Sequence, residues 1–212
     1  MVAFGAAAHA AGTVDSAQIL PQQTPEKPYF DMNLLTVSYA WMMDVNSGLT
    51  INNVMGGTIT AGQSFGETSQ SYHTWYAQTG YLFGKGSEEM DTYYGARLEQ
   101  SIIPVLMGYT YHYKLTERLS AYAGAQAGFY YSKTHKSVEN NFIRVTHTKF
   151  APTVGVEVGA TYKLSKRVSW DIGVQLNNTF SLDKETDDHF DIGTTSKNAV
   201  TTTIHTGILF TF

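Results

Sequence analysis

The feature that most constrains this chain is a two-residue alternation of apolar and polar side chains, sustained over unusually long segments. The clearest example lies in residues 167–180, where Val168, Trp170, Ile172 and the residues in phase with them are apolar except for Asn178. The other phase consists of polar residues and Gly. Successive side chains of a β-strand point to opposite faces, so the pattern predicts a strand with one apolar face. Ordinary strands have about five or six residues. This one has the about 9–11 residues that a tilted strand needs to cross a bilayer.

The same alternation recurs along most of the chain. We expect long strands at residues 98–114, 119–132, 148–164, 167–181 and 198–212. The first half is less regular, with strands expected at residues 31–45, 57–65 and 73–85. The weak segment 57–65 is included because an even number of strands keeps both chain ends on one side of a membrane barrel. The sequence therefore predicts an all-β fold, an eight-stranded antiparallel up-and-down transmembrane β-barrel.

The connections between the expected strands alternate in length. Residues 114–118 and 163–167 are tight turns, and residues 132–147 and 182–197 are expected to be long polar loops. The two turns open a repeated pattern, Lys-Leu-x-x-Arg-x-Ser-x-x-x-Gly-x-Gln, which predicts two equivalent hairpins. Short turns on one side and long loops on the other are typical of outer-membrane barrels.

The distribution of aromatic residues favours a membrane over water. Only 15% of the residues are charged, against about 25% in average soluble domains. The phase that would coat a soluble barrel such as a lipocalin consists mainly of Gly, Thr, Ser, Asn and Gln, which is a poor water-facing surface. Aromatic residues of the apolar phase gather at both strand ends, as in the girdles of membrane barrels. The girdle residues are Tyr113, Tyr162, Trp170, Phe210 and Phe212 near the short turns, and Phe129, Tyr131, Phe150 and Phe180 near the long loops.

Composition narrows the possible partners and the domain organisation. A net charge of −4 leaves no basic footprint for nucleic acid, and the absence of cysteine excludes disulfides and thiolate metal sites.

Residues 1–10 resemble the end of a signal peptide, with an Ala-x-Ala cleavage pattern at residues 8–10. We expect residues 11–28 to form a flexible polar linker and residues 29–212 to form the barrel.

Three segments resemble the opacity-like and OmpA-like families of small outer-membrane β-barrels. The ending Ile208-Leu209-Phe210-Thr211-Phe212 resembles the C-terminal signal of outer-membrane proteins, and residues 102–111 and 119–128 resemble two successive strands of these families. The resemblance implies a bacterial outer-membrane location among outer-membrane lipid and lipopolysaccharide. It also implies that the barrel-assembly machinery recognises Phe212. These families include adhesins and structural barrels, so the resemblance implies a structural or surface-interaction role, in adhesion or envelope integrity.

The polar phase predicts a network inside the barrel. Its candidate members are Glu157, Asp171, His112, His205, Gln126 and Gln175. Buried carboxylates need partners, and the phase offers Arg97, His112, Lys163 and His205 as candidates without selecting among them. Because an eight-stranded barrel is just wide enough to be filled by side chains, we expect a side-chain-filled polar interior rather than a diffusion pore.

Two alternative functions to a structural or surface-interaction barrel remain open. Lipid A deacylases use a His-x-Ser pair with a Glu, and His135-Lys136-Ser137 with Glu139 has these residue types, but we expect the pair to lie in the 132–147 loop. A secreted lipocalin-like barrel that binds an apolar ligand is the other alternative. Because the chain shows no phosphate-binding loop and no metal-ligand spacing of its histidines, we expect no enzyme, no cofactor, no metal and a monomeric protein.

Overall fold

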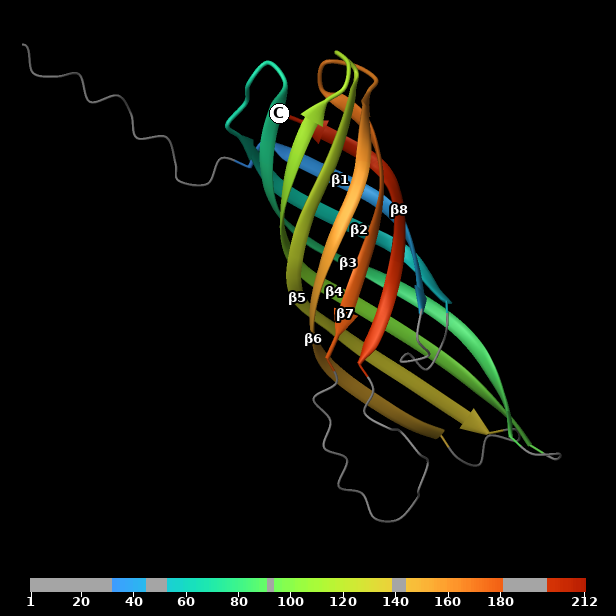
Figure 1. Ribbon diagram of the computed structural model, residues 1–212. Coiled ribbons are helices and arrows are strands. Elements are labelled where there is room, and N and C mark those ends of the chain that lie inside the picture. Colours follow the sequence, from blue (N-terminus) through green and yellow to red (C-terminus); the bar gives the residue numbers. More distant parts are fainter. Residues whose placement is uncertain (1–31, 45–52, 91–93, 139–143, 181–197) are drawn as a thin grey trace, which may run out of the picture. The chain divides into compact units, whose positions relative to one another are not determined.

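The structure, a computed structural model, describes residues 32–44, 53–90, 94–138, 144–180 and 198–212 (Figure 1). The strands are β1 (Leu34–Asp44), β2 (Asn53–Phe65), β3 (Ser71–Met90), β4 (Tyr94–Lys114), β5 (Leu119–Val138), β6 (Arg144–Lys163), β7 (Val168–Thr179) and β8 (Ala199–Thr211). None of the described residues belongs to a helix long and apolar enough to cross a membrane. The predicted signal-peptide remnant (1–10) and linker (11–28) lie outside the described residues.

The eight strands form one closed barrel. Each strand pairs with its sequence neighbours, and β1 closes the barrel against β8 in antiparallel register from Leu34↔Thr211 to Asp44↔Thr201. At the end of this seam the Phe212 amide donates to the Asn33 carbonyl at 3.0 Å. The predicted up-and-down barrel is confirmed, including its weak second strand. The first described residues and Phe212 lie at the end that carries the short turns, as expected (Figure 1).

The repeated sequence pattern produces two equivalent turns. In the β4–β5 turn the Thr116 hydroxyl accepts from the Leu119 amide at 3.0 Å, and in the β6–β7 turn the Ser165 hydroxyl accepts from the Val168 amide at 3.2 Å. Side-chain hydroxyls that bind nearby amides favour turns over continued strand. The β2–β3 turn uses a different device, because Gly66 adopts a φ of 63°, which a residue with a Cβ rarely adopts.

Five strands are longer than the sequence predicts: β2 begins at Asn53, and β3 to β6 extend further toward the long connections. The expected 132–147 loop is mostly strand, since β5 continues to Val138, β6 begins at Arg144, and Ser137 pairs with Arg144. On the other side, β3 and β4 stay paired as far as Met90↔Tyr94. The prediction was wrong because these segments are polar on both faces, so the apolar alternation ends where the strands leave the membrane. The expected 182–197 loop lies outside the described residues.

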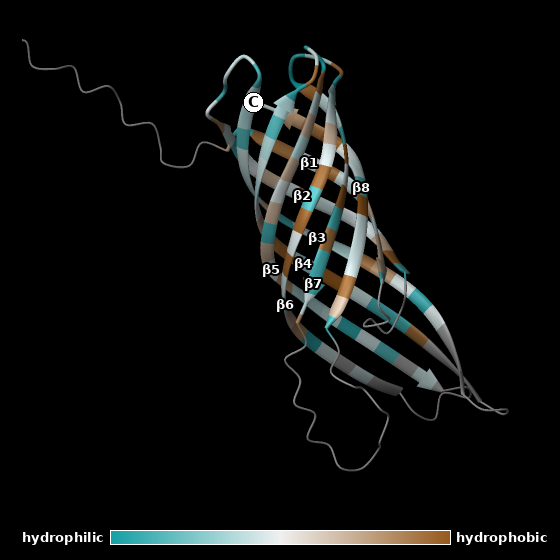
Figure 2. Cartoon of the chain, in the orientation of Figure 1, coloured by the Kyte–Doolittle hydropathy of each residue, from teal (hydrophilic) through white to brown (hydrophobic). Residues whose placement is uncertain are grey.

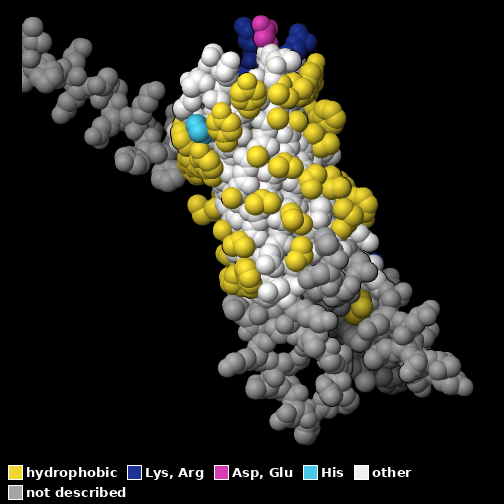
Figure 3. Space-filling view, viewed as in Figure 1, with side chains coloured by type: hydrophobic (Ala, Val, Ile, Leu, Met, Phe, Trp, Pro, Cys, Tyr) yellow, Lys and Arg dark blue, Asp and Glu magenta, His cyan; other side chains and the backbone are white. Residues whose placement is uncertain are grey.

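The two faces of the barrel wall differ as the alternation predicts. In β7 exposed and buried side chains alternate, and Val174 is 39% exposed while its neighbour Gln175 is 4% exposed. Val156 and Ile208 also point outward, whereas Glu157, Asp171 and His205 are buried inside. Figure 2 shows alternating hydropathy along the strands, and Figure 3 shows hydrophobic side chains spread over the outer wall.

The interior is divided into an apolar half and a polar half. Toward the long connections, inward side chains form an apolar cluster: Ala40, Met42, Val54, Leu82, Leu98, Ile102, Leu106 and Tyr130. Toward the short turns, the inward side chains are mainly Ser, Thr, Tyr, His and carboxylates. The polar side chains expected inside the barrel therefore occupy the half toward the short turns. In the run 102–107 both phases of β4 are apolar, so one set faces outward and the other fills the barrel.

Candidate functional site

The polar half of the barrel encloses a cavity of about 670 Å³ that opens between the short turns. All eight strands contribute to its lining. Many of the inward residues here are small, among them Thr36, Ser38 and Thr60, so their side chains leave the centre of the barrel open. Small hydroxyl side chains therefore explain why this half is not filled as expected.

The floor of the cavity is a hydrogen-bonded layer centred on Glu157. The Tyr76 hydroxyl lies 2.7 Å from Glu157 Oε1 and 2.9 Å from Gln126 Oε1, so this phenol connects β3 with β5 and β6. The second carboxylate oxygen of Glu157 accepts from Gln175 Nε2 at 3.3 Å, and the same amide donates to Gln78 at 3.3 Å. The layer thus connects strands that lie far apart around the barrel.

A second group lies on the cavity wall. His205 Nε2 lies 3.2 Å from Asp171 Oδ2 and 3.2 Å from the Tyr122 hydroxyl, so His205 is the predicted partner that the structure assigns to Asp171. His112 makes a different contact, with its Nε2 2.9 Å from the Thr110 hydroxyl and its ring stacked on Tyr72. The six predicted interior residues are all buried, and the structure divides them among these contacts.

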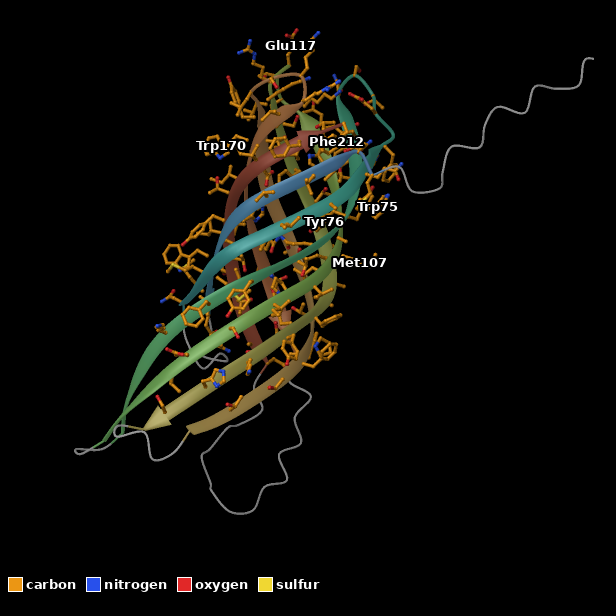
Figure 4. All side chains as sticks on the ribbon, turned by 180° about the vertical axis from the view of Figure 1, so that it is seen from behind. Trp75, Tyr76, Met107, Glu117, Trp170 and Phe212 are labelled. Atoms are coloured by element: carbon orange, nitrogen blue, oxygen red, sulfur yellow. The ribbon has the colours of Figure 1, made fainter. Side chains whose placement is uncertain are left out.

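Glu157 takes its partners from outside the predicted set. Its contacts are Tyr76 and Gln175 rather than His112, Lys163 or His205, and the side chain of Arg97 lies outside the described residues. Tyr76, which is labelled in Figure 4, belongs to β3 and is 81 residues from Glu157 in the sequence. In the structure Gly108 on β4 is paired directly with Tyr76. A glycine in the middle of an otherwise regular strand is the one sequence feature that could have indicated a large side chain lying across it.

Glycines shape this polar half. A Cβ added to Gly108 would overlap the ring and hydroxyl of Tyr76, and one added to Gly159 would overlap the Tyr122 ring. The two tyrosines therefore lie flat across glycines of neighbouring strands, which is how their hydroxyls reach Glu157 and His205. A glycine in a strand has no side chain to pack, but it allows a side chain from a neighbouring strand to approach its backbone closely.

The predicted aromatic residues lie on the outer wall. Tyr113, Tyr162, Trp170 and Phe210 near the short turns, and Tyr131 and Phe150 at the other end, are 37–54% exposed, and Phe212 is 78% exposed. Phe129 and Phe180 are half-buried, and Phe129 packs on Phe150 with ring centroids 4.4 Å apart. Trp170 Nε1 donates to the Thr206 hydroxyl at 2.8 Å. The girdle role of these residues stays a prediction.

A further aromatic cluster lies on the outer wall, and Phe65 and His73 are the members that sequence reasoning missed. It consists of Phe65, His73, Tyr109 and Tyr111, with His73 stacked on Phe65 at 5.6 Å between ring centroids. Trp75 lies on the same face of β3, and its indole donates to Gln63 at 3.2 Å. These residues lie on the outward face of β2, β3 and β4. The alternation that identifies this face was clear in the sequence of β3 and β4 but not in that of β2.

A comparison with protein families identifies the chain. Its residues 1–212 match the outer membrane protein beta-barrel domain. The chain belongs to this outer-membrane β-barrel family. The short turns of such barrels face the periplasm, and the long connections face the outside of the cell. The cavity therefore opens to the periplasm, and the protein resides in the bacterial outer membrane, so the secreted lipocalin-like alternative is excluded.

Solved structures of other outer-membrane barrels share the fold. Neisserial surface protein A (NspA) is 14% identical with a TM-score of 0.53, over 84% of this chain and 96% of that one. Ail of Yersinia pestis, solved with the heparin analogue sucrose octasulfate, is 13% identical with a TM-score of 0.50, over 85% and 98%. The Escherichia coli protease OmpT is 10% identical with a TM-score of 0.42, over 88% and 99%. At these identities the likeness concerns the fold alone, and fold does not decide activity. No curated protein matches the sequence.

The periplasmic mouth of this outer-membrane barrel is rich in charge. Lys114, Arg118, Lys163 and Lys166 line it together with Glu67 and Glu117, and Figure 3 shows basic side chains around an acidic one at this end. The Lys114 ammonium donates to Glu67 at 2.7 Å and holds the pKa of that carboxyl below its ordinary value. Within the described part of the chain, Lys163 and Lys166 form no ion pair.

The His-x-Ser pair lies elsewhere than predicted. His135 and Ser137 belong to β5, not to a loop, and they share the outward phase of Tyr131. Glu99 is paired with His135 on one side, and Thr146 on the other side has its hydroxyl 2.9 Å from His135 Nδ1. No hydrogen bond joins His135 to Ser137 among the described side chains, and Glu139 lies outside them. The described residues also contain no group of three His, Cys, Asp or Glu that could hold a metal ion.

Proposed function

We propose that this protein is a monomeric, non-enzymatic surface-interaction barrel that binds polyanionic glycan outside the cell. The observation that carries the proposal is the extension of β3–β6 beyond the rest of the wall. Pairing of β2 with β3 stops at Met55↔Phe83, and pairing of β6 with β7 stops at Thr153↔Thr179. β3 and β4 continue for seven further pairs, from Gly84↔Gln100 to Met90↔Tyr94. Seven residues of strand span roughly 20 Å.

The charge of this extension differs from that of the whole chain. In the β5 and β6 parts of the extension, residues 132–138 and 144–152, the sequence has four basic residues and no Asp or Glu. The basic residues are Lys133, Lys136, Arg144 and Lys149. The chain as a whole has a net charge of −4, so positive charge is concentrated in this hairpin. Such a local excess attracts polyanions and raises their local concentration.

The extension is held in shape by its own contacts. Gln100 Nε2 donates to the Ser132 hydroxyl at 3.0 Å, and Lys85 lies 3.4 Å from Glu99. These contacts add to continuous backbone pairing of four strands. A preformed surface loses little conformational freedom on binding, which favours affinity.

The base of the extension suits a second anionic partner. Lys85 lies over the Phe83 ring at 5.4 Å, and Lys133 follows the exposed Tyr131 by one outward step. Basic residues just beyond an aromatic girdle lie at the level of lipid headgroups. We therefore propose that lipopolysaccharide phosphates contact Lys85 and Lys133 and steady the extension above the membrane.

Binding of sucrose octasulfate, used as a polyanionic probe, tests this function. We expect the refolded barrel to bind it, and Lys133→Glu with Lys149→Glu to weaken binding by at least about tenfold. Arg167→Glu, in the periplasmic β6–β7 turn and outside the lining of the cavity, is the matched control and should leave binding unchanged. Equal weakening by all variants, or no binding by the wild type, would contradict the proposal.

One observation keeps lipid A modification as a second candidate. His135 and Ser137 lie on the outward face of β5, with Glu99 at the position paired with His135. These are the residue types of a Ser nucleophile and its general base, with the imidazole of His135 in contact with the Thr146 hydroxyl rather than with Ser137. If the chain removes an acyl group, lipid A from expressing cells will lose the mass of one fatty acid, and Ser137→Ala will restore it. Unchanged lipid A in both strains would exclude this candidate.

A further inference from the structure

The periplasmic end of the barrel carries a second feature, which is separate from the extension of β3–β6. There the cavity of about 670 Å³ opens between three turns. Ligand pockets typically have volumes of about 300–1,000 Å³, so the cavity is large enough for a small molecule. The apolar cluster around Leu82, Ile102 and Leu106 closes its far side. A blind cavity of this kind receives a ligand from the periplasm and does not conduct it.

The mouth of the cavity carries an excess of positive charge. Four basic residues line it against two acidic ones, Glu67 and Glu117. Glu67 is already bound by Lys114. Lys163 and Lys166, which form no ion pair among the described residues, flank the opening on the β6–β7 hairpin. The mouth therefore favours a ligand that carries a carboxylate or phosphate group.

The wall of the cavity has the chemistry of a carbohydrate site. Inward hydroxyls of Thr36, Ser38, Thr60 and Ser120 can donate to or accept from sugar hydroxyls. The carboxylate of Asp171 and the rings of Tyr72 and Tyr122 belong to the same lining. The lining also includes Leu34, Phe65 and Leu209, whereas the apolar cluster lies beyond the floor layer of Tyr76 and Glu157.

We infer that the periplasmic cavity binds a small anionic sugar. The acidic group lies at the mouth against Lys163 and Lys166, and the sugar hydroxyls face the hydroxyl-lined wall. This site is separate from the proposed glycan surface of β5 and β6, since the two lie at opposite ends of the barrel. Sugar acids and sugar phosphates share the required chemistry, and the test distinguishes them.

Calorimetric titration of the full chain, refolded in detergent, tests the inference with glucuronate, glucose 6-phosphate and glucose. We expect at least one anionic sugar to bind about tenfold or more tightly than glucose. Whichever anion binds better identifies the carboxylate or the phosphate as the preferred group. The double variant Lys163→Ala, Lys166→Ala should weaken that binding by about tenfold or more.

Two further variants make the result decisive. Thr60→Trp places a large side chain in the cavity and should abolish binding while the barrel still shows heat-modifiable migration on a gel. Lys133→Ala, in the extracellular extension, should bind the sugar as the wild type does. The inference is overturned if no sugar binds, if glucose binds as well as the anions, or if Lys133→Ala weakens binding as much as the mouth variant.

Discussion

A single methyl group added at Gly108 should destabilise the barrel through Tyr76. The new Cβ would overlap Cζ, Cε1 and the hydroxyl oxygen of Tyr76, so the ring must move. Its hydroxyl then leaves Glu157 Oε1 and Gln126 Oε1, now 2.7 and 2.9 Å away. Overpacking of this kind costs about 1–3 kcal/mol, and leaving a buried polar group without its partner costs about 1–3 kcal/mol. We expect Gly108→Ala to lower the free energy of unfolding by about 2–6 kcal/mol, the sum of the two costs.

Urea unfolding of the lipid-refolded protein, followed by tryptophan fluorescence, measures this loss. Gly57→Ala is the matched control, because a Cβ there lies 3.9 Å from its nearest neighbour, the Ser38 carbonyl. That variant should change the free energy of unfolding by less than about 1 kcal/mol. In a Tyr76→Ala background, Gly108→Ala should also change the free energy of unfolding little, because the ring that the new Cβ would overlap is absent.

The double-mutant cycle decides whether the reasoning holds. A coupling energy close to the whole cost of Gly108→Ala would assign that cost to the contact with Tyr76. If the two substitutions are additive, or if Gly57→Ala costs as much as Gly108→Ala, the effect arises from strand propensity and not from the floor layer.

Two further substitutions and one deletion test other parts of the structure. Val174→Arg places a charge on the lipid-facing wall and should cost about 2–4 kcal/mol near the bilayer centre, measured by the same unfolding assay, whereas an equal loss in a lipid-free soluble form would refute the orientation. Deletion of Phe212 removes burial worth only about 1.5–3 kcal/mol, so the variant should refold in detergent yet fail to reach the outer membrane in cells; normal outer-membrane levels would show that assembly does not require this residue. The lowered pKa of Glu67 means that its pairing with Lys114 stabilises the fold above the carboxyl's ordinary pKa of 4.5 and is lost as the pH falls through the lowered value. Glu67→Gln should remove that acid-side loss, which is below about 1 kcal/mol for so exposed a pair, and an unchanged pH profile would show that the pairing adds no stability.

The sequence predicted the membrane-spanning part of the fold because the bilayer imposes a strict pattern there. Lipid on one side and a packed interior on the other force alternation, so β7 and β8 were visible as long strands. The extension of β5 and β6 carries no such constraint. Water lies on both of its faces, so Thr146 and Thr148 pair as strand residues in a segment whose composition suggests a loop.

The interior was predictable by phase but not by contact. Alternation placed Glu157 and Asp171 inside, since each side chain's phase is a local property. Which residues meet inside depends on the register of strands that are distant in sequence, and so Tyr76 was missed as the partner of Glu157. Both phases of residues 102–107 are apolar, but the prediction of a polar interior did not take this into account, and so the apolar cluster was missed.

The apolar cluster also gives the barrel a sidedness. Met42, Val54, Leu82, Ile102 and Leu106 are each at most 1% exposed, so a hydrophilic molecule outside the cell meets a dry barrier before it meets His205 or Asp171. The same molecule in the periplasm meets an open cavity. Among the described residues, this cluster separates the cavity from the extracellular end, so the two ends of this small barrel present different surfaces to two compartments.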